Sequence, residues 1–324
     1  MLEVIEAAGL ATLQDPGRLG WRRYGVPASG PMDPFAFAAA NLLAGNSPEE
    51  AELEVGGGDV VLRAASDCVI AVAGAGYRLR VNIWEYPLWG SYFVRGGWIV
   101  RLEKSGFGMW AYVVLTGGIE AASVLGSRST YLRGRFGGWE GRPLQAGDVL
   151  QCVASSRGLM ESAGRSLEPG ARPSYGIDPI LEFTPGPQGE SFERESLSTL
   201  TSSAYRVSLS SDRMGYRLEG ARLKHGGSAD LTSEGMTMGS IQVPADGAPI
   251  VMMADCATTG GYPKIGCVSR ADLPLLAQCT PGRDTVRFRE TTVEAAQERC
   301  RAAVKRMKAG VRQSDEGTGP IGAG

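Results

Sequence analysis

Apolar and polar residues alternate along many short stretches of the chain, and a few other stretches are briefly and continuously apolar. Alternation is typical of a β-strand with one buried face, and a short apolar run is typical of a strand buried on both faces. Small and polar turn residues separate the stretches. The pattern therefore predicts a first lobe of β-strands over residues 1–153. Its strand-like stretches are residues 59–63, 68–74, 77–83, 96–104 and 109–118.

The pattern breaks at residues 154–176, which are rich in serine, glycine, proline and arginine and have no apolar period. Such a composition is typical of a linker. Strand-like stretches then resume and predict a second β lobe over residues 177–290. We therefore expect a mainly β protein of two lobes with a few short helices. The stretches of the second lobe are residues 180–186, 205–211, 240–244, 248–255 and 285–290.

Two segments carry the start and stop signals of helices. Within residues 32–45, Asp33 stands at the N-cap and Gly45 just beyond the last turn. A C-terminal helix is predicted over residues 291–309, because a Thr-x-x-Glu capping box opens it and basic residues close it. The remaining residues 310–324 are polar and rich in glycine, which predicts a disordered tail.

One short pattern occurs twice. The letters GVPASG at residues 25–30 and GYPKIG at residues 261–266 share two glycines and a proline at the same spacing, and each precedes a helical segment. In the second copy Ser269 stands where it would cap the helix, and Lys264 occupies the position of Ala28. The pattern favours a duplicated lobe, although a glycine-rich chain also produces such matches by chance. A cation in one turn only suggests a role in binding an anion.

The charges nearly balance, with 33 Lys plus Arg against 35 Asp plus Glu and a net charge of −2. This balance favours neither nucleic acid nor an anionic membrane as a partner. No apolar run approaches the roughly 18 residues that span a bilayer, and the first residues lack the basic start of a secretory signal. The six cysteines form no CxxC pair, as expected for reduced thiols. We expect a cytoplasmic protein.

The chain has one histidine, His225, and this count limits its chemistry. Zinc sites built on two or three histidines are impossible within the chain, and a Ser-His-Asp triad would have to use His225. We interpret His225 as a solvated loop residue, because two glycines follow it. No metal site is predicted.

Polar side chains gather at the ends of strand-like stretches in the second lobe. Because strand ends of a barrel converge, Arg213, Glu234, Asp255, Thr258 and Lys264 form a candidate anion or acid-base constellation. Simpler interpretations compete with this one: the aspartate could cap its turn, the arginine could pair with a nearby glutamate, and the lysine could be a solvated surface residue.

Neighbouring residues complete the candidate site. In the first lobe, a loop rich in arginine and aromatic residues is typical of a ligand pocket or of a partner-binding face. The chain has neither a P-loop nor a strand-linked GxGxxG, so a nucleotide would have to bind in an unfamiliar mode. The residues predicted to bind substrate or phosphate are Thr258, Thr259, Gly260, Gly261, Arg18 and Tyr24.

Several long motifs resemble the biotin-dependent carboxyltransferase family that contains the C subunit of 5-oxoprolinase. The same family includes a carboxyltransferase portion of urea amidolyase and the Kip antagonist of a kinase inhibitor. The resemblance extends over about residues 1–290, with departures at Cys256 and Ala257, where the family often has Arg-Gln, and at Gly266, where it often has Ala. The motifs are QDPGRLGWRRYGVPASGPMDPFAFAAANLLAGN, SDRMGYRLEG, IQVPADGAPIVMMADCATTGGYPKIG and ADLPLLAQCTPGRDTVRF.

The resemblance implies two cyclophilin-like β-barrel lobes and one component of a heteromeric hydrolase. With an obligate B subunit and also an A subunit of 5-oxoprolinase, such a protein opens the ring of 5-oxoproline to glutamate at the expense of ATP, with Mg²⁺. Lys264 and Arg213 would then stabilise charge on the amide oxygen, and Asp255 or Glu234 would handle a metal or protons.

The family leaves two other interpretations open. One is transfer of a carboxyl group from carboxybiotin to urea or a related amide, with biotin supplied in trans because the chain has no AMKM-type attachment sequence. The other is a non-catalytic antagonist of a kinase inhibitor.

Overall fold

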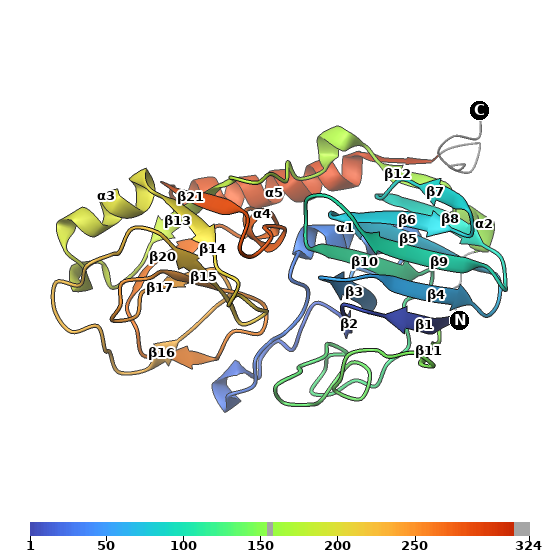
Figure 1. Cartoon of the computed structure of the whole chain (residues 1–324), viewed down its shortest axis with the longest axis horizontal. Helices are drawn as coiled ribbons and strands as arrows, with labels where there is room; N and C mark the ends of the chain where they lie inside the picture. The colour runs from blue at the N-terminus through green and yellow to red at the C-terminus, as the bar shows by residue number, and fades with distance from the viewer. Residues whose placement is uncertain (154–157, 314–324) are drawn as a thin grey trace. The chain divides into compact units, whose positions relative to one another are not determined.

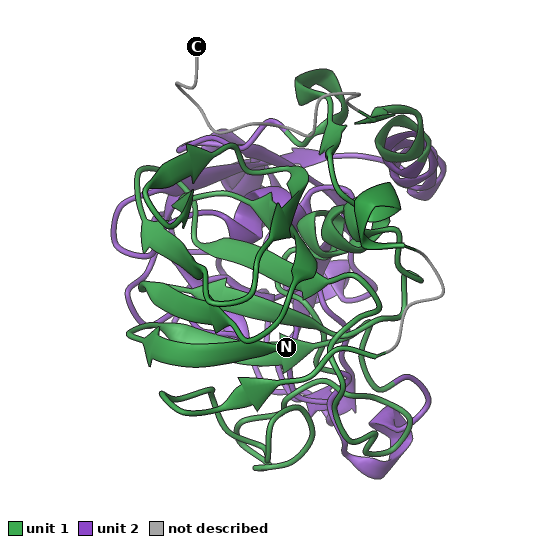
Figure 2. Cartoon of the chain, turned by 90° about the vertical axis from the view of Figure 1, so that its right-hand side faces the viewer, with its two compact units in different colours: residues 1–18, 29–173, 305–324 green, residues 19–28, 174–304 purple. Residues whose placement is uncertain are grey.

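The computed structural model describes residues 1–153 and 158–313, which form two compact units. The first unit contains residues 1–18, 29–173 and those from 305 onward, and the second contains residues 19–28 and 174–304 (Figure 2). Each unit therefore includes pieces of chain that are far apart in sequence, and we describe each unit by itself.

Two β-sheets build the first unit (Figure 1). Side chains from both sheets form one hydrophobic core. The six-stranded sheet has the order β11 (Val149–Leu150), β1 (Leu2–Ala7), β4 (Val60–Ala64), β9 (Ile99–Lys104), β6 (Tyr77–Val81) and β7 (Trp84–Tyr86). The seven-stranded sheet has the order β2 (Leu10–Gln14), β3 (Glu52–Gly56), β10 (Trp110–Leu115), β5 (Cys68–Gly74), β8 (Gly90–Val94), β12 (Arg165–Leu167) and β22 (Val311–Gln313).

Helix α1 (Pro34–Ala44) packs against strands β5 and β10 of the first unit. Its start follows from Asp33, whose carboxylate accepts hydrogen bonds from the backbone N–H groups of Phe35 (3.1 Å) and Ala36 (2.9 Å). Its end follows from Gly45, which adopts the left-handed conformation (φ 72°) that glycine tolerates best. The helix predicted within residues 32–45 is therefore confirmed.

A closed barrel of seven strands forms the second unit. The strands are, in order, β13 (Ile180–Pro185), β20 (Lys264–Val268), β17 (Ser240–Gln242), β18 (Ile250–Met252), β15 (Gly215–Glu219), β14 (Ala204–Val207) and β21 (Thr285–Glu290). Parallel pairing of β13 with β21 closes the ring, and the buried aromatic rings of Phe183, Tyr205 and Phe288 pack edge to face. A separate two-stranded antiparallel sheet pairs β16 (Glu234–Gly235) with β19 (Thr259–Gly260). The mainly β prediction is confirmed.

The helices are few and mostly short. The longest is α5 (Val293–Ala309). Its Arg299 pairs with Asp272 (2.6 Å) and with Glu182 of the barrel unit. Among the residues that the structure describes, no helix combines the length and apolar character needed to cross a bilayer. The remaining helical segments are η1 (Arg22–Tyr24), α2 (Leu159–Ser162), η2 (Pro169–Ala171), η3 (Gly189–Ser191), α3 (Arg194–Ser202) and α4 (Leu273–Ala277).

The structure differs from the predicted boundaries at residues 19–28, which belong to the second unit, and at the expected linker and tail. The expected linker, residues 154–176, contains β12, which pairs with β8 and β22 in the seven-stranded sheet. The expected disordered tail, residues 310–324, begins with β22. Both strands have three residues, too few for a visible alternation, so only their pairing defines them. Residues 154–157 and 314–324 lie outside the described residues.

The two similar hexapeptides adopt different conformations. Residues 25–30 form a turn in which Gly25 and Gly30 have positive φ angles (81° and 94°), whereas Lys264 begins strand β20. The helix after the second copy begins at Leu273 with Asp272 at the N-cap, so the predicted cap at Ser269 is wrong. A shared glycine and proline spacing therefore does not indicate a shared turn here.

Candidate functional site

Lys264 lies at the start of β20, and its ammonium group contacts Glu234. The Nζ atom is 2.8 Å from Glu234 Oε2 and 3.5 Å from the carbonyl oxygen of Gly235, and the lysine side chain is only 11% exposed. The pairing of β17 with β20 shifts register beside Lys264, from Ile241 opposite Gly266 to Gln242 opposite Lys264. An irregularity of this kind re-aims a side chain at the end of a strand.

Gln188 joins this ion pair through both ends of its amide. Its Nε2 atom donates to Glu234 Oε2 (2.7 Å), and its Oε1 atom accepts from the backbone N–H of Lys264 (3.2 Å). The Glu234 side chain remains 49% exposed. The hydrogen bond and charge of Lys264 lower the pKa of Glu234, so the carboxylate is ionised at neutral pH. Lys264, Glu234 and Gln188 together are called the lysine cluster below.

The antiparallel pairing of β16 with β19 positions Glu234. Glu234 lies opposite Gly260, and Gly235 opposite Thr259. A Cβ atom at position 260 would lie 2.5 Å from Gln242 Nε2, so a larger residue there would require the Gln242 side chain to move. Two of the predicted binding residues thus form the strand that pairs with Glu234.

Arg213 and Asp255 form a separate, buried ion pair. Arg213 Nε donates to Asp255 Oδ2 (2.8 Å) and its NH2 group donates to Oδ1 (3.1 Å), with the two side chains 6% and 7% exposed. The backbone of Asp255 also donates to the Arg213 carbonyl (2.8 Å). Glu219, the other possible partner of Arg213, pairs with Arg206 (2.6 Å). The predicted constellation therefore separates into two ion pairs, and this one holds the turn that follows β18.

Arg22 is a site residue that the sequence analysis missed. Its guanidinium donates to the carbonyl oxygens of Met236 and Ala257 (3.2 Å to the latter) and lies 3.9 Å from the Cys256 sulfur. Met236 in turn donates its backbone N–H to the carbonyl of Thr258 (2.9 Å). Arg22 therefore ties the segment after Glu234 to the segment before Thr258. It also places a guanidinium beside Cys256.

Arg18 and Tyr24 occupy different surroundings, although both come from the arginine-rich loop. Arg18 is fully buried in the first unit, where it donates to the carbonyl oxygens of Val124 (3.1 Å) and Ser129 and lies over the Phe136 ring. These contacts give Arg18 a role in the fold of the first unit, in contrast to the predicted role in binding phosphate. Tyr24 is 62% exposed and belongs to the second unit.

The lysine cluster presents a hydrogen-bond acceptor beside a donor. A carboxylate next to an ammonium group matches the edge of a cis amide, which displays its N–H and C=O on the same side. Lactams, urea and cyclic ureas all have such an edge. Within residues 1–153 and 158–313, no group of three or more His, Cys, Asp or Glu side chains is arranged to hold a metal ion.

The family described as "Carboxyltransferase domain, subdomain A and B" matches residues 24–290. The chain is 36% identical over 296 residues to the C subunit of 5-oxoprolinase from Haemophilus influenzae and 37% identical over 303 residues to that of Escherichia coli. Each match covers 91% of this chain and 93% of the relative.

A solved structure of K. lactis urea amidolyase has the same fold, with a TM-score of 0.88 and 29% identity. The match covers 98% of this chain but 21% of that much longer chain. Urea amidolyase of Saccharomyces cerevisiae is 30% identical, and the match covers 91% of this chain and 17% of the relative. The chain belongs to the carboxyltransferase family of subdomains A and B.

Proposed function

We propose that this chain is the C subunit of an ATP-dependent 5-oxoprolinase, which acts in the cytoplasm with the B and A subunits as partners. The observation that carries the proposal is the end-to-end match to two relatives named as C subunits of 5-oxoprolinase, since more than nine tenths of each chain is covered. A match that covers nine tenths of both proteins supports a shared function more strongly than a match to one part of a longer enzyme.

The lysine cluster supports a role at the ring amide. Hydrolysis adds water to the carbonyl carbon of the lactam and breaks the ring C–N bond, and the nitrogen leaves as an amine after it takes up a proton. The Lys264 ammonium would stabilise negative charge on the carbonyl oxygen, and the Glu234 carboxylate would accept the lactam N–H. Because its pKa is lowered, Glu234 suits hydrogen-bond acceptance rather than proton donation. Arg213 and Asp255 would act as positioning residues.

The lysine cluster does not fit a nucleoside triphosphate. It presents an exposed carboxylate that would repel the phosphate groups. We therefore assign the binding of ATP and Mg²⁺ to the partner proteins of the complex.

The proposal is tested in the reconstituted complex by measuring ATP hydrolysis and glutamate formation with and without 5-oxoproline. Lys264→Met should lower turnover by at least about 100-fold, the usual cost of removing one group that stabilises an oxyanion. Lys308→Ala, a change at an exposed lysine of α5, serves as the control. A wild-type complex without turnover that depends on 5-oxoproline would refute the function. Full activity of Lys264→Met would refute only the role of the lysine.

Carboxyl transfer to urea or a related amide is the second candidate. The match to K. lactis urea amidolyase favours it, and urea displays the same amide edge as a lactam. In this case carboxybiotin would come from another protein. Carboxylation of urea by the chain with a biotinylated carrier, but no hydrolysis of 5-oxoproline by the assembled complex, would favour this candidate.

A further inference from the structure

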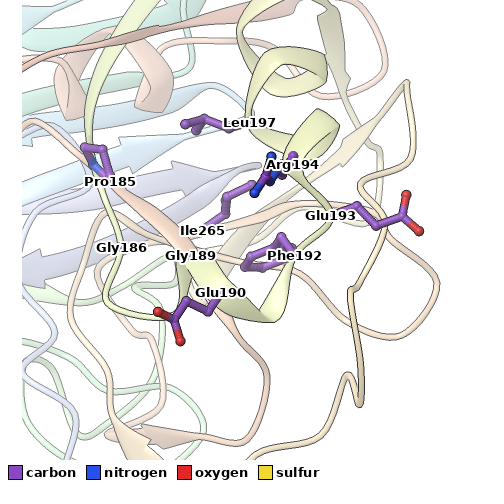
Figure 3. A pocket seen from close by; sticks show the side chains of 9 residues that line it. All are labelled: Pro185, Gly186, Gly189, Glu190, Phe192, Glu193, Arg194, Leu197 and Ile265. Atoms are coloured by element: carbon purple, nitrogen blue, oxygen red, sulfur yellow. The ribbon is translucent and has the colours of Figure 1, made fainter.

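The second unit has a cavity of about 440 Å³ that the lysine cluster does not use. It lies where the end of β13, the η3 turn and the first turn of α3 meet β20 (Figure 3). Its apolar wall consists of Pro185, Phe192, Leu197 and Ile265. This volume is within the usual range for sites that bind small molecules.

The aromatic part of the wall is firmly held. Phe192 is buried, and its ring stacks on the His225 ring with centroids 5.2 Å apart and planes inclined by 29°. His225 is fixed in turn by a hydrogen bond between its Nε2 atom and the carbonyl oxygen of Pro244 (3.0 Å). The single histidine of the chain therefore supports a wall of the cavity, and this wall is preformed.

One cation faces the cavity. Arg194 begins α3, and within the described part of the chain its guanidinium forms neither an ion pair nor a hydrogen bond. Figure 3 shows the guanidinium above Ile265, whereas the carboxylates of Glu190 and Glu193 point away from it. The Oε2 atom of Glu193 lies 3.7 Å from the Nζ atom of Lys224, with which it forms an ion pair. The combination of one uncompensated guanidinium with an apolar wall matches a ligand that has one carboxylate and an apolar body.

We propose that this cavity binds a small monocarboxylate with an apolar ring or short chain, and that the ligand regulates the lysine cluster. The connection is the loop of residues 185–191. Gly186 packs against the backbone of Lys264 so closely that a Cβ atom would lie 2.1 Å from its carbonyl oxygen. Gln188, between the cavity-lining residues Gly186 and Gly189, bonds to both Lys264 and Glu234. The regulatory part rests on the proposed function, whereas the binding part does not.

Binding is tested on the isolated chain with benzoate as the probe and cyclohexylamine as the probe of opposite charge, by calorimetry and ligand-observed NMR. The chain should bind benzoate with a dissociation constant below about 10 mM, the range expected for a fragment of this size. Arg194→Gln should weaken binding at least about tenfold, since it removes the cation at an exposed position without changing the wall. Leu197→Trp should abolish benzoate binding, because the larger side chain fills the cavity.

Two control variants locate the site. Arg217→Gln removes another exposed arginine of the same unit, and Lys264→Met alters the lysine cluster; both should bind benzoate like the wild type. Absence of benzoate binding, equal binding of cyclohexylamine, or unchanged binding by Arg194→Gln would overturn the proposal. Loss of binding in Lys264→Met would assign the ligand to the lysine cluster instead and would also overturn it.

Regulation is tested in the assembled complex. Saturating benzoate should change the KM or kcat for 5-oxoproline in the wild type but not in the Arg194→Gln complex. Unchanged kinetic constants in an active wild-type complex would overturn the regulatory role. If the complex has no 5-oxoprolinase activity, the proposed function fails, and the binding experiment still decides whether the cavity is a ligand site.

Discussion

Lys264 loses most of its hydration to reach Glu234, whereas Glu234 keeps about half of its side chain in solvent. The pair therefore combines a buried cation with an accessible anion. A ligand that approaches from solvent meets the carboxylate first and displaces little water from the lysine. This asymmetry leaves Glu234, rather than Lys264, open to solvent.

Substitution of Glu234 by glutamine should remove a pH-dependent part of the stability. Because Lys264 lowers the pKa of Glu234, the pair contributes stability above the unfolded-state pKa of about 4.3 and loses it as the pH falls through the folded-state pKa. The melting temperature of Glu234→Gln should therefore fall below that of the wild type at pH 6 to 8, and the difference should shrink toward pH 3. A difference in melting temperature that does not change with pH would contradict the ion pair between Glu234 and Lys264.

The stability that Glu52 contributes should depend on pH in the opposite direction. It is fully buried in β3 of the first unit, and this burial raises its pKa well above the usual range. A raised pKa contributes stability below the unfolded-state value of about 4.3 that is lost as the pH rises toward the folded-state pKa.

Glu52→Gln keeps the shape of the neutral acid but cannot titrate. The variant should therefore gain stability relative to the wild type as the pH rises from 5 to 8, by up to about 1.4 kcal/mol for each pH unit. Urea denaturation at several pH values measures this difference. Parallel pH profiles of the two proteins would show that Glu52 is ionised in the folded state.

At the scale of elements, the Arg213–Asp255 pair holds the turn after β18 to the loop before β15. Asp255→Asn should destabilise the protein by about 3–5 kcal/mol, because it removes the charge of a carboxylate that pairs with a buried guanidinium. The double variant Arg213→Met/Asp255→Leu should recover much of this loss, since both charges are then absent. Chemical denaturation of the three proteins gives the comparison. A double variant less stable than Asp255→Asn would indicate that Arg213 has a further essential partner.

The sequence was informative where structure depends on neighbours in the chain. The caps of α1, Asp33 and Gly45, are local signals, and they located this helix correctly. Lys264 appeared to lie in a turn because glycine and proline surround it, but β20 forms through pairing with β13 and β17. The contact of Arg22 with Met236 joins residues 214 positions apart, and no periodicity could reveal it.

At the scale of the molecule, the mainly β architecture could be predicted, but the limits of the units could not. Alternation showed that strands dominate both halves of the chain. It could not show that residues 19–28 group with the second unit, or that residues 311–313 complete a sheet of the first. Such assignments depend on pairing between distant segments, which a pattern within one segment does not encode.

Removal of the last strand tests the contribution of these distant segments. A chain that ends at Gly310 lacks β22 and exposes the edge of β12, which then loses the pairing of Arg165, Ser166 and Leu167. The melting temperature of the first unit should fall by several degrees, while benzoate binding and the Lys264–Glu234 contact in the second unit should not change. Hydrogen exchange of the β12 amides measures the local effect. Unchanged protection of these amides would contradict the pairing.

The pairing of β12 with β22 also constrains how the protein is made. As the nascent chain leaves the ribosome, β12 emerges before the strands of the barrel, whereas β22 emerges only after them. The edge of β12 in the seven-stranded sheet therefore stays unpaired until the barrel residues have been translated. Chaperones that shield unpaired strands have their longest opportunity to act during this interval.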